Sequence, residues 1–209
     1  MSSGSHRELW LVRHGETPAS RGRRLAGWTD VPLTERGEQQ AAALRPVLEG
    51  QIFDSVWSSD LIRAVTTARL AWGEPSQEPR LRELNFGNLE GDDFMALEPK
   101  LQGDVLRFDD FTAPGGESLG EMRARVMSFI EPLPGGRHLL FAHGGVVRLF
   151  ARDVGHDRFV PTGTLLVVNW DTRTLISIRE GEGTPRDEKD AVIEESSRQG
   201  DTGEASEGG

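Results

Sequence analysis

The sequence lacks cysteine altogether and has no long hydrophobic run among its 209 residues. Without cysteine the chain forms no disulfide and performs no thiolate chemistry, so a reducing cytoplasm is the default compartment. Residues 1–8 are polar, and the apolar stretch that follows ends at Arg13, far short of the roughly 20 apolar residues that cross a bilayer. We therefore expect a soluble, cytoplasmic protein with neither a signal peptide nor a membrane partner.

Basic residues are also scarce, since 24 Lys and Arg stand against 34 Asp and Glu and the net charge is -10. This balance argues against a nucleic-acid partner bound through bulk charge. Much of the negative charge lies in residues 181–209, where nine acidic and three basic side chains leave -6. The rest of the chain is only mildly acidic and is compatible with a basic pocket.

The length suits one domain, because a domain takes about 150 residues. We expect a flexible N-terminus at residues 1–7 and a folded domain at residues 8–180. Residues 181–209 are acidic and contain few apolar side chains, so we expect a disordered tail there.

Apolar runs and helical patterns alternate along the domain. Residues 9–12 and 55–57 are predicted as buried strands. Thr34 is predicted to cap a helix that runs to about residue 48, with Pro46 kinking or shortening it. Asp60 is predicted to cap the next helix, whose first turn holds Arg63 near the positive end of the helix dipole. That position suits an anion.

Residues 85–117 are rich in Gly, Pro and Asp and suit a loop or short-helix insertion over the site. The other expected elements are a helix at 118–130, a strand at 138–142, a helix at 144–154 and a hairpin of strands 164–170 and 174–178. This alternation predicts an α/β fold, a three-layer α/β/α sandwich with a mostly parallel central sheet.

Two histidines each follow a predicted apolar strand and precede a glycine. One lies in Arg13-His14-Gly15-Glu16 and the other in Ala142-His143-Gly144-Gly145. Because the carboxyl ends of strands border the ligand crevice of an open α/β sheet, the two histidines can converge there. Neutral imidazole is a nucleophile and an arginine fork suits phosphate oxygens, so His14 and Arg13 are predicted as a nucleophile beside a phosphate clamp.

Five motifs occur in a fixed order. They are Leu11-Val12-Arg13-His14-Gly15-Glu16-Thr17, Gly27-Trp28-Thr29-Asp30-Val31-Pro32-Leu33-Thr34, Ser58-Ser59-Asp60-Leu61-Ile62-Arg63-Ala64, Leu81-Arg82-Glu83-Leu84-Asn85-Phe86-Gly87 and Ala142-His143-Gly144-Gly145. Over about residues 9–170 the chain resembles the histidine phosphatase superfamily. The resemblance is to the branch with phosphoglycerate mutases, fructose-2,6-bisphosphatases, α-ribazole phosphatases and broad-specificity phosphatases.

The resemblance implies a phosphoglycerate mutase-like fold and a phosphohistidine formed on His14. It implies that Arg13 and Arg63 bind the phosphoryl oxygens, that His143 completes the pocket, and that Glu83 is the general acid. Glu78 and Glu90 remain alternatives for the acid. The further expected substrate contacts are Thr17, Ser20, Arg24, Gly27, Phe86, Glu117 and Gly144.

Phosphoryl transfer needs an in-line nucleophile, cations around the phosphoryl oxygens and a proton for the leaving group. Two arginines, one cationic histidine (His143) and one glutamate supply these without a metal ion or cofactor. No metal-binding sequence spacing is present, and we expect activity to survive a chelator.

The branch contains both phosphatases and mutases, and several departures favour a phosphatase. Mutases resemble this chain at residues 27–34, but they have Trp-Asn-like sequence where this chain has Ala19-Ser20, and a Lys where it has Phe94. A long basic insertion before the second histidine motif is missing, whereas residues 114–118 look like those of phosphatases. We expect hydrolysis of a small-molecule phosphate monoester by a monomer or homodimer. A cofactor-dependent phosphoglycerate mutase and a non-catalytic phospho-ligand binding module are the alternatives.

Overall fold

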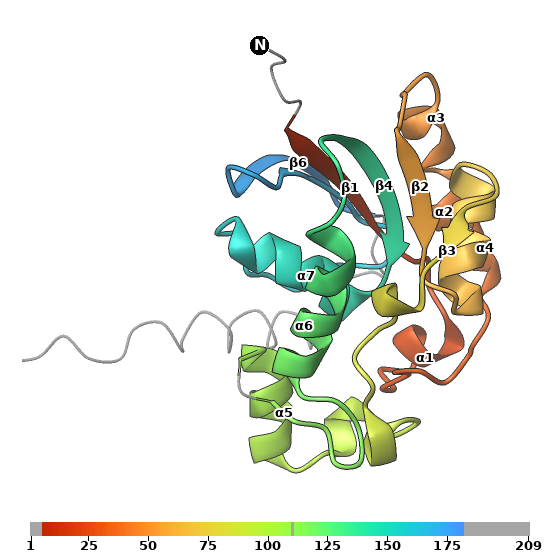
Figure 1. Ribbon diagram of the computed structural model, residues 1–209. Coiled ribbons are helices and arrows are strands. Elements are labelled where there is room, and N and C mark those ends of the chain that lie inside the picture. The colour runs from red at the N-terminus through yellow and green to blue at the C-terminus, as the bar shows by residue number, and fades with distance from the viewer. Residues whose placement is uncertain (1–5, 110, 182–209) are drawn as a thin grey trace, which may run out of the picture.

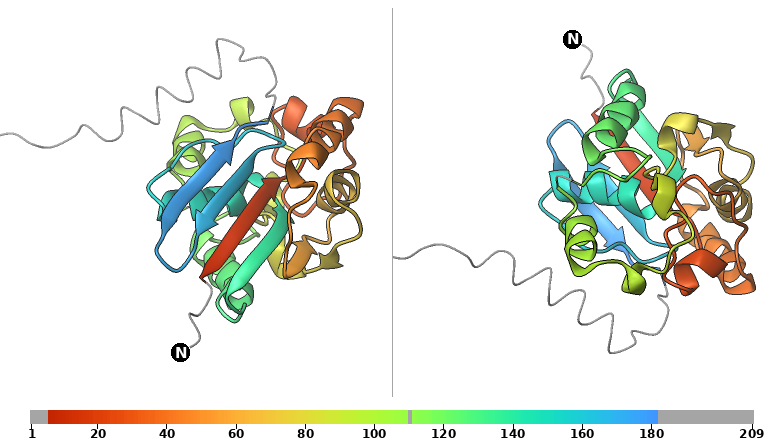
Figure 2. Two further views of the ribbon diagram at one scale, coloured as in Figure 1. Left: turned by 90° about the horizontal axis from the view of Figure 1, so that it is seen from above. Right: turned by 90° about the horizontal axis from the view of Figure 1, so that it is seen from below.

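The computed structural model describes residues 6–109 and 111–181 and contains one six-stranded sheet in the order β3-β2-β4-β1-β5-β6. The strands are β1 Arg7–Arg13, β2 Ser55–Ser58, β3 Ser76–Gln77, β4 Gly136–Ala142, β5 Leu165–Asn169 and β6 Thr174–Arg179. The first four are parallel, and β5 and β6 add an antiparallel hairpin beside β1, as the left view of Figure 2 shows. The expected mostly parallel sheet and the hairpin are confirmed.

Helices cover both faces of the sheet (Figure 1). They are α1 Pro18–Arg21, α2 Glu35–Ala42, α3 Arg45–Leu48, α4 Ile62–Ala71, α5 Pro99–Arg107, α6 Leu119–Ile130 and α7 Gly144–Asp153, with 3₁₀ turns η1 Pro79–Leu81, η2 Gly87–Leu89 and η3 Phe94–Ala96. Successive residues of a strand point to opposite faces, so Leu140 packs toward α6 and α7 while Phe141 packs toward α3 and α4. The three-layer α/β/α sandwich is confirmed.

The helix expected at 34–48 is two helices, α2 and α3. Thr34 is the N-cap of α2 as predicted, and its hydroxyl accepts from the Gly37 amide at 3.1 Å. Pro46 has no N–H to donate to a preceding turn, so it is tolerated only near the start of a new helix, where α3 places it.

The prediction that Asp60 caps the following helix is wrong. The N-cap of α4 is Leu61, which makes no side-chain cap bond. The Asp60 carboxylate instead pairs with Arg82, while Asp30 Oδ1 accepts from the Ile62 amide at 2.8 Å. A long-range ion pair with arginine therefore outcompetes the local cap for Asp60.

The segment 85–117 forms η2, η3, α5 and connecting loops, and in Figure 1 it lies beyond the carboxyl ends of β1 and β4. It ends at α6, where Ser118 and Glu121 form a reciprocal capping box. The sequence did not predict α1 or the two-residue β3, because both are too short to show a period. Of the N-terminus expected to be flexible at residues 1–7, residues 1–5 lie outside the described residues, whereas Arg7 belongs to β1, where it pairs with Gly136. The tail expected to be disordered at residues 181–209 lies outside them except for Gly181.

Candidate active site

The carboxyl ends of two neighbouring parallel strands bring the two histidines together. Arg13 at the end of β1 is level with Ala142 at the end of β4, and the His14 amide donates to the Ala142 carbonyl at 3.0 Å. His14 and His143 follow directly, and their ring centroids lie 5.2 Å apart. Residues 129 positions apart in the chain thus share one buried site.

The His14 side chain is held in one tautomer. Its Nδ1 lies 2.7 Å from the Gly15 carbonyl oxygen, which only accepts, so Nδ1 carries the proton and Nε2 keeps its lone pair. Burial, followed by the charges of Arg63 and Arg13, holds the pKa of His14 well below its usual value. The ring is therefore neutral and nucleophilic at neutral pH. Gly15 packs tightly on α2, since a Cβ there would lie 2.2 Å from the Gly37 carbonyl oxygen.

His143 is also neutral, contrary to the expected cationic histidine. Its Nδ1 accepts from Arg63 Nε at 3.2 Å, so this nitrogen carries no proton. Its Nε2, which lies 2.8 Å from the Ser59 hydroxyl, is then the donor. Burial, with the charges of Arg63, His14 and Arg13, holds the pKa of His143 well below its usual value. Both ring nitrogens of His143 are thus engaged within the protein, and the positive charge of the site comes from arginine.

Arg63 projects from the first turn of α4 and is 1% exposed. Its Nη2 donates to the Gly27 carbonyl at 2.6 Å, its Nη1 donates to the Thr29 carbonyl at 2.9 Å, and its Nε donates to His143. A guanidinium has five N–H bonds, and these contacts use three of them. Two Nη–H bonds are left for an anion, and Gly27 contributes a carbonyl that orients the arginine.

Arg13 has a buried Nε without a hydrogen-bond partner, and its Nη1 donates to the Val160 carbonyl. The phenyl ring of Phe159 lies over this guanidinium, with 5.3 Å between Cζ and the ring centroid. Burial lowers the pKa of Arg13 to about 10, which still leaves it cationic at neutral pH. A Cβ at Gly144 would lie 3.2 Å from Arg13 Cζ, so glycine there gives the guanidinium room.

The Glu83 carboxylate lies at the N-terminus of α7. Its two oxygens are 3.2 and 3.1 Å from the Gly145 amide nitrogen, and Oε1 also accepts from the Leu84 amide at 2.9 Å. Its negative charge raises the pKa values of both Arg13 and Arg63 against the larger lowering by burial. Glu83 therefore faces the same site as the two arginines.

The two other glutamates considered as the acid are engaged elsewhere. Glu78 forms an ion pair with Arg80 at 2.7 Å. Glu90 accepts from the amides of Trp28 and Thr29, each at 2.8 Å, and so fixes the loop whose carbonyls hold Arg63. This arrangement favours Glu83 over both.

Five of the expected substrate contacts have partners within the protein. Thr17 and Ser20 form the capping box of α1, and Arg24 is exposed and donates to the Gly91 carbonyl at 2.8 Å. The Phe86 ring packs against Phe111, and Glu117 pairs with Arg125 at 2.7 Å. The structure thus brings together Arg13, His14, Gly27, Arg63, Glu83, His143 and Gly144, and it does not show the other five among them.

Two residues that support the site, Ser59 and Gln40, were not predicted from the sequence. Ser59, which contacts His143, stood in a recognised motif without an assigned role. Gln40 of α2 accepts from the Glu16 amide at 2.7 Å and so supports the loop after His14. Nothing in the local sequence identifies such a partner, because each contact joins separate elements.

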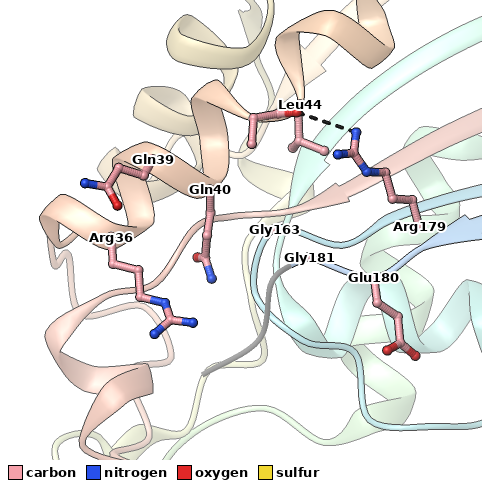
Figure 3. Close-up of a pocket in the computed structure, with 9 residues that line it drawn as sticks. Arg36, Gln39, Gln40, Leu44, Gly163, Arg179, Glu180 and Gly181 are labelled. Atoms are coloured by element: carbon pink, nitrogen blue, oxygen red, sulfur yellow. Dashed lines mark hydrogen bonds between the residues drawn. The ribbon is translucent and has the colours of Figure 1, made fainter. Parts of the chain in front are cut away.

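A cavity of about 460 Å³ lies between α2 and the ends of the β5–β6 hairpin (Figure 3). Its lining comprises Arg36, Gln39, Gln40, Ala43, Leu44, Gly163, Arg179, Glu180 and Gly181. Gly163 connects it to the site, because its amide contacts the carbonyls of Arg13 and His14. None of the site's two arginines, its two histidines and Glu83 lines this cavity.

Within residues 6–109 and 111–181, no group of three or more His, Asp or Glu side chains is placed to hold a metal ion. In the same residues, no helix combines the length and the apolar character needed to cross a membrane.

The fold and site define an α/β protein with two buried histidines and two arginines at the carboxyl ends of parallel strands. The family model of the histidine phosphatase superfamily (branch 1) matches residues 9–182. The chain therefore belongs to this superfamily.

The names of individual relatives include a phosphatase and a probable mutase. A zebrafish protein named fructose-2,6-bisphosphatase TIGAR B is 35% identical over 148 residues, covering 66% of this chain and 57% of the relative, little more than half its length. A probable phosphoglycerate mutase GpmB from Photorhabdus laumondii is 38% identical over 152 residues, covering 66% of this chain and 69% of that protein. The crystal structure of TTHB049 from Thermus thermophilus is 46% identical with a TM-score of 0.77, covering 83% of this chain and 99% of that one.

Proposed function

We propose that the protein is a phosphatase that hydrolyses small-molecule phosphate monoesters through a phosphohistidine on His14. The observation that carries this proposal is the free Nε2 lone pair of His14 beside two arginines with uncommitted donors. Arg13 offers its buried Nε–H, and Arg63 offers two Nη–H bonds. This donor set suits the three equatorial oxygens of a transferring phosphoryl group.

The reaction runs in two steps. His14 Nε2 attacks phosphorus, the bond from phosphorus to the ester oxygen breaks, and Glu83 passes a proton to the departing oxygen. A water molecule then attacks the phosphohistidine, Glu83 takes its proton, and the P–N bond breaks to release phosphate. Arg13 and Arg63 stabilise the phosphoryl oxygens in both steps, and His143, which accepts from Arg63 Nε, holds that arginine in place. These side chains supply every group the chemistry needs, so we propose that no metal ion or cofactor takes part.

A mutase is the second candidate, because the relatives include proteins named phosphatase and proteins named probable mutase. A mutase must hold a carboxylate near the phosphoryl group and protect the phosphohistidine from water. Phe94, which stands where mutases have a Lys, is 9% exposed and supplies no cation. Ser20, which stands where they have an Asn, is engaged in the α1 cap. Both features support hydrolysis over transfer.

Release of phosphate from p-nitrophenyl phosphate in excess EDTA tests the proposal. Wild type should turn over, and His14→Ala should form no acid-labile phosphoenzyme and lose at least about 1,000-fold in kcat. His138→Gln is the matched control, because this buried imidazole contacts Ser55 and the Pro134 carbonyl outside the site. Isomerisation of phosphoglycerate that depends on 2,3-bisphosphoglycerate would favour the mutase. Binding of phosphate esters without turnover would instead favour a binding module.

A further inference from the structure

Glu83 lies in a segment that has no regular secondary structure of its own. The segment connects η1 to η2, and no strand or helix includes residues 82–86. An isolated stretch of this kind has no ladder of backbone hydrogen bonds to fix its path. The amides of Gly145 and Leu84 bind the Glu83 carboxylate itself, whereas the path of the backbone that carries it depends on partners from other elements.

One guanidinium on α6 binds two carbonyls of this segment and a third in the adjoining η1. Arg125 Nη1 donates to the carbonyls of Arg80 and Arg82 at 2.8 and 3.1 Å, and Nη2 donates to that of Glu83 at 3.2 Å. Its Nε and Nη2 also donate to the two Glu117 carboxylate oxygens, at 2.7 and 2.8 Å. All five N–H bonds of Arg125 are engaged, so its place is determined from several directions.

A tryptophan also binds the backbone of Glu83. Trp28 Nε1 donates to the Glu83 carbonyl at 2.7 Å, so this one oxygen accepts from both Trp28 and Arg125. The guanidinium Cζ atoms of Arg82 and Arg125 lie 5.0 and 5.7 Å from the centroid of the Trp28 ring. Glu117 completes the arrangement, because its Oε2 also accepts from the Asn85 amide at 3.1 Å. The residues on both sides of Glu83 are thus fixed by partners from outside the segment.

We propose that Arg125 is a positioning residue which, together with Trp28, sets where the Glu83 carboxyl group meets the leaving-group oxygen. This inference rests on the proposed function, in which Glu83 is the acid and base. Arg125 acts through the backbone of Glu83 and does not touch the substrate. Its loss should therefore impair proton transfer while leaving phosphate binding by Arg13 and Arg63 intact.

The dependence of kcat/KM on the leaving group tests this role. An alkyl phosphate needs a proton on its departing oxygen, whereas 2,4-dinitrophenyl phosphate does not. Arg125→Lys keeps the charge, but a single ammonium cannot bind three carbonyls and a carboxylate at once. We expect kcat/KM for the alkyl ester to fall about 10- to 100-fold, a part of what a general acid contributes, and that for the dinitrophenyl ester to change less than about threefold.

Two further variants calibrate the result. Glu83→Gln should show the same leaving-group dependence more steeply. Arg123→Lys is the matched control on the same helix, because Arg123 pairs with Asp153 away from the site, and it should behave as wild type with both esters.

Equal losses with both esters in Arg125→Lys would overturn the inference and leave Arg125 a structural residue. If Arg125→Lys does not fold, Trp28→Phe decides, since it removes a donor to the same carbonyl but keeps the aromatic ring. A Trp28→Phe enzyme without leaving-group dependence would overturn the inference too. If Glu83→Gln itself shows no such dependence, the proposed function fails, which is a separate outcome from failure of Arg125 alone.

Discussion

A single methyl group at Gly145 should displace the proposed acid without disturbing the fold. Gly145 is the second residue of α7, and a Cβ there would lie 2.4 Å from Glu83 Oε1. Non-bonded heavy atoms sit about 3.5 Å apart, so the carboxylate must move by about 1 Å. The oxygen is at the free end of a flexible side chain, and the next neighbour of the Cβ outside Glu83 is Met122 Cε at 3.6 Å. The side chain can therefore yield while the backbone stays.

A displacement of this size should lower the reaction rate strongly but change the stability of the fold little. Misplacing a reacting group by about 1 Å can cost about 100-fold in rate. In Gly145→Ala we expect a loss of this order in kcat/KM for an alkyl phosphate. Alanine is also the better helix former, by up to about 1 kcal/mol, so the melting temperature should stay level or rise slightly.

The assay compares kcat/KM and the melting temperature of Gly145→Ala with those of Gly120→Ala. Gly120 is the second residue of α6, and the only atom near a Cβ there is Ser118 Oγ at 3.9 Å, so this variant controls for helix propensity. Unchanged activity in Gly145→Ala would show that catalysis does not use the carboxylate where the structure places it. A fall of many degrees in melting temperature would show that the backbone moved instead of the side chain.

Two other predictions concern the arginines and histidines of the site. Arg63→Lys should lower kcat/KM at least about 100-fold, as steady-state kinetics will measure. It should also reduce the free energy of unfolding by about 1–3 kcal/mol, because the Gly27 and Thr29 carbonyls lose their donors. An unchanged free energy of unfolding in urea would contradict these contacts. His14 and His143 have lowered pKa values when folded, so the unfolded chain binds more protons below pH about 6.5. The free energy of unfolding should therefore be highest above that pH and fall as the pH drops below it. Measured by urea unfolding between pH 5 and 7.5, it should depend less steeply on pH in His14→Gln than in wild type.

The sequence predicted those parts of the site that depend on local patterns. Each histidine follows an apolar run, and parallel strands align their carboxyl ends, so the meeting of His14 and His143 needed no further information. Arg63 was placed correctly in the first turn of its helix, although Asp60 does not cap it. An aspartate before an apolar helix is a good local cap, but Arg82, 22 residues away, takes its carboxylate.

The parts that escaped prediction depend on contacts between distant elements. The neutral state of His143 follows from a donor on another helix, Arg63, and no pattern around residue 143 reveals it. The bonds from Arg125 to the Glu83 segment join residues 42 to 45 positions apart. The interruption between α2 and α3 was predicted in part, because Pro46 lacks a backbone N–H wherever it stands and so disfavours a continuous helix.

The hydrogen bond between His14 Nδ1 and the Gly15 carbonyl means that the main chain, one residue away, determines which ring nitrogen is free for the proposed reaction. In many enzymes a separate carboxylate orients the catalytic imidazole, and losing that side chain disables it. Here no such side chain is available to lose. The orientation of the imidazole depends instead on Gly15 and Gly37. Their backbones approach so closely that even alanine at Gly15 would collide with a carbonyl oxygen. A screen for inactivating substitutions should therefore recover two residues that have no functional group at all.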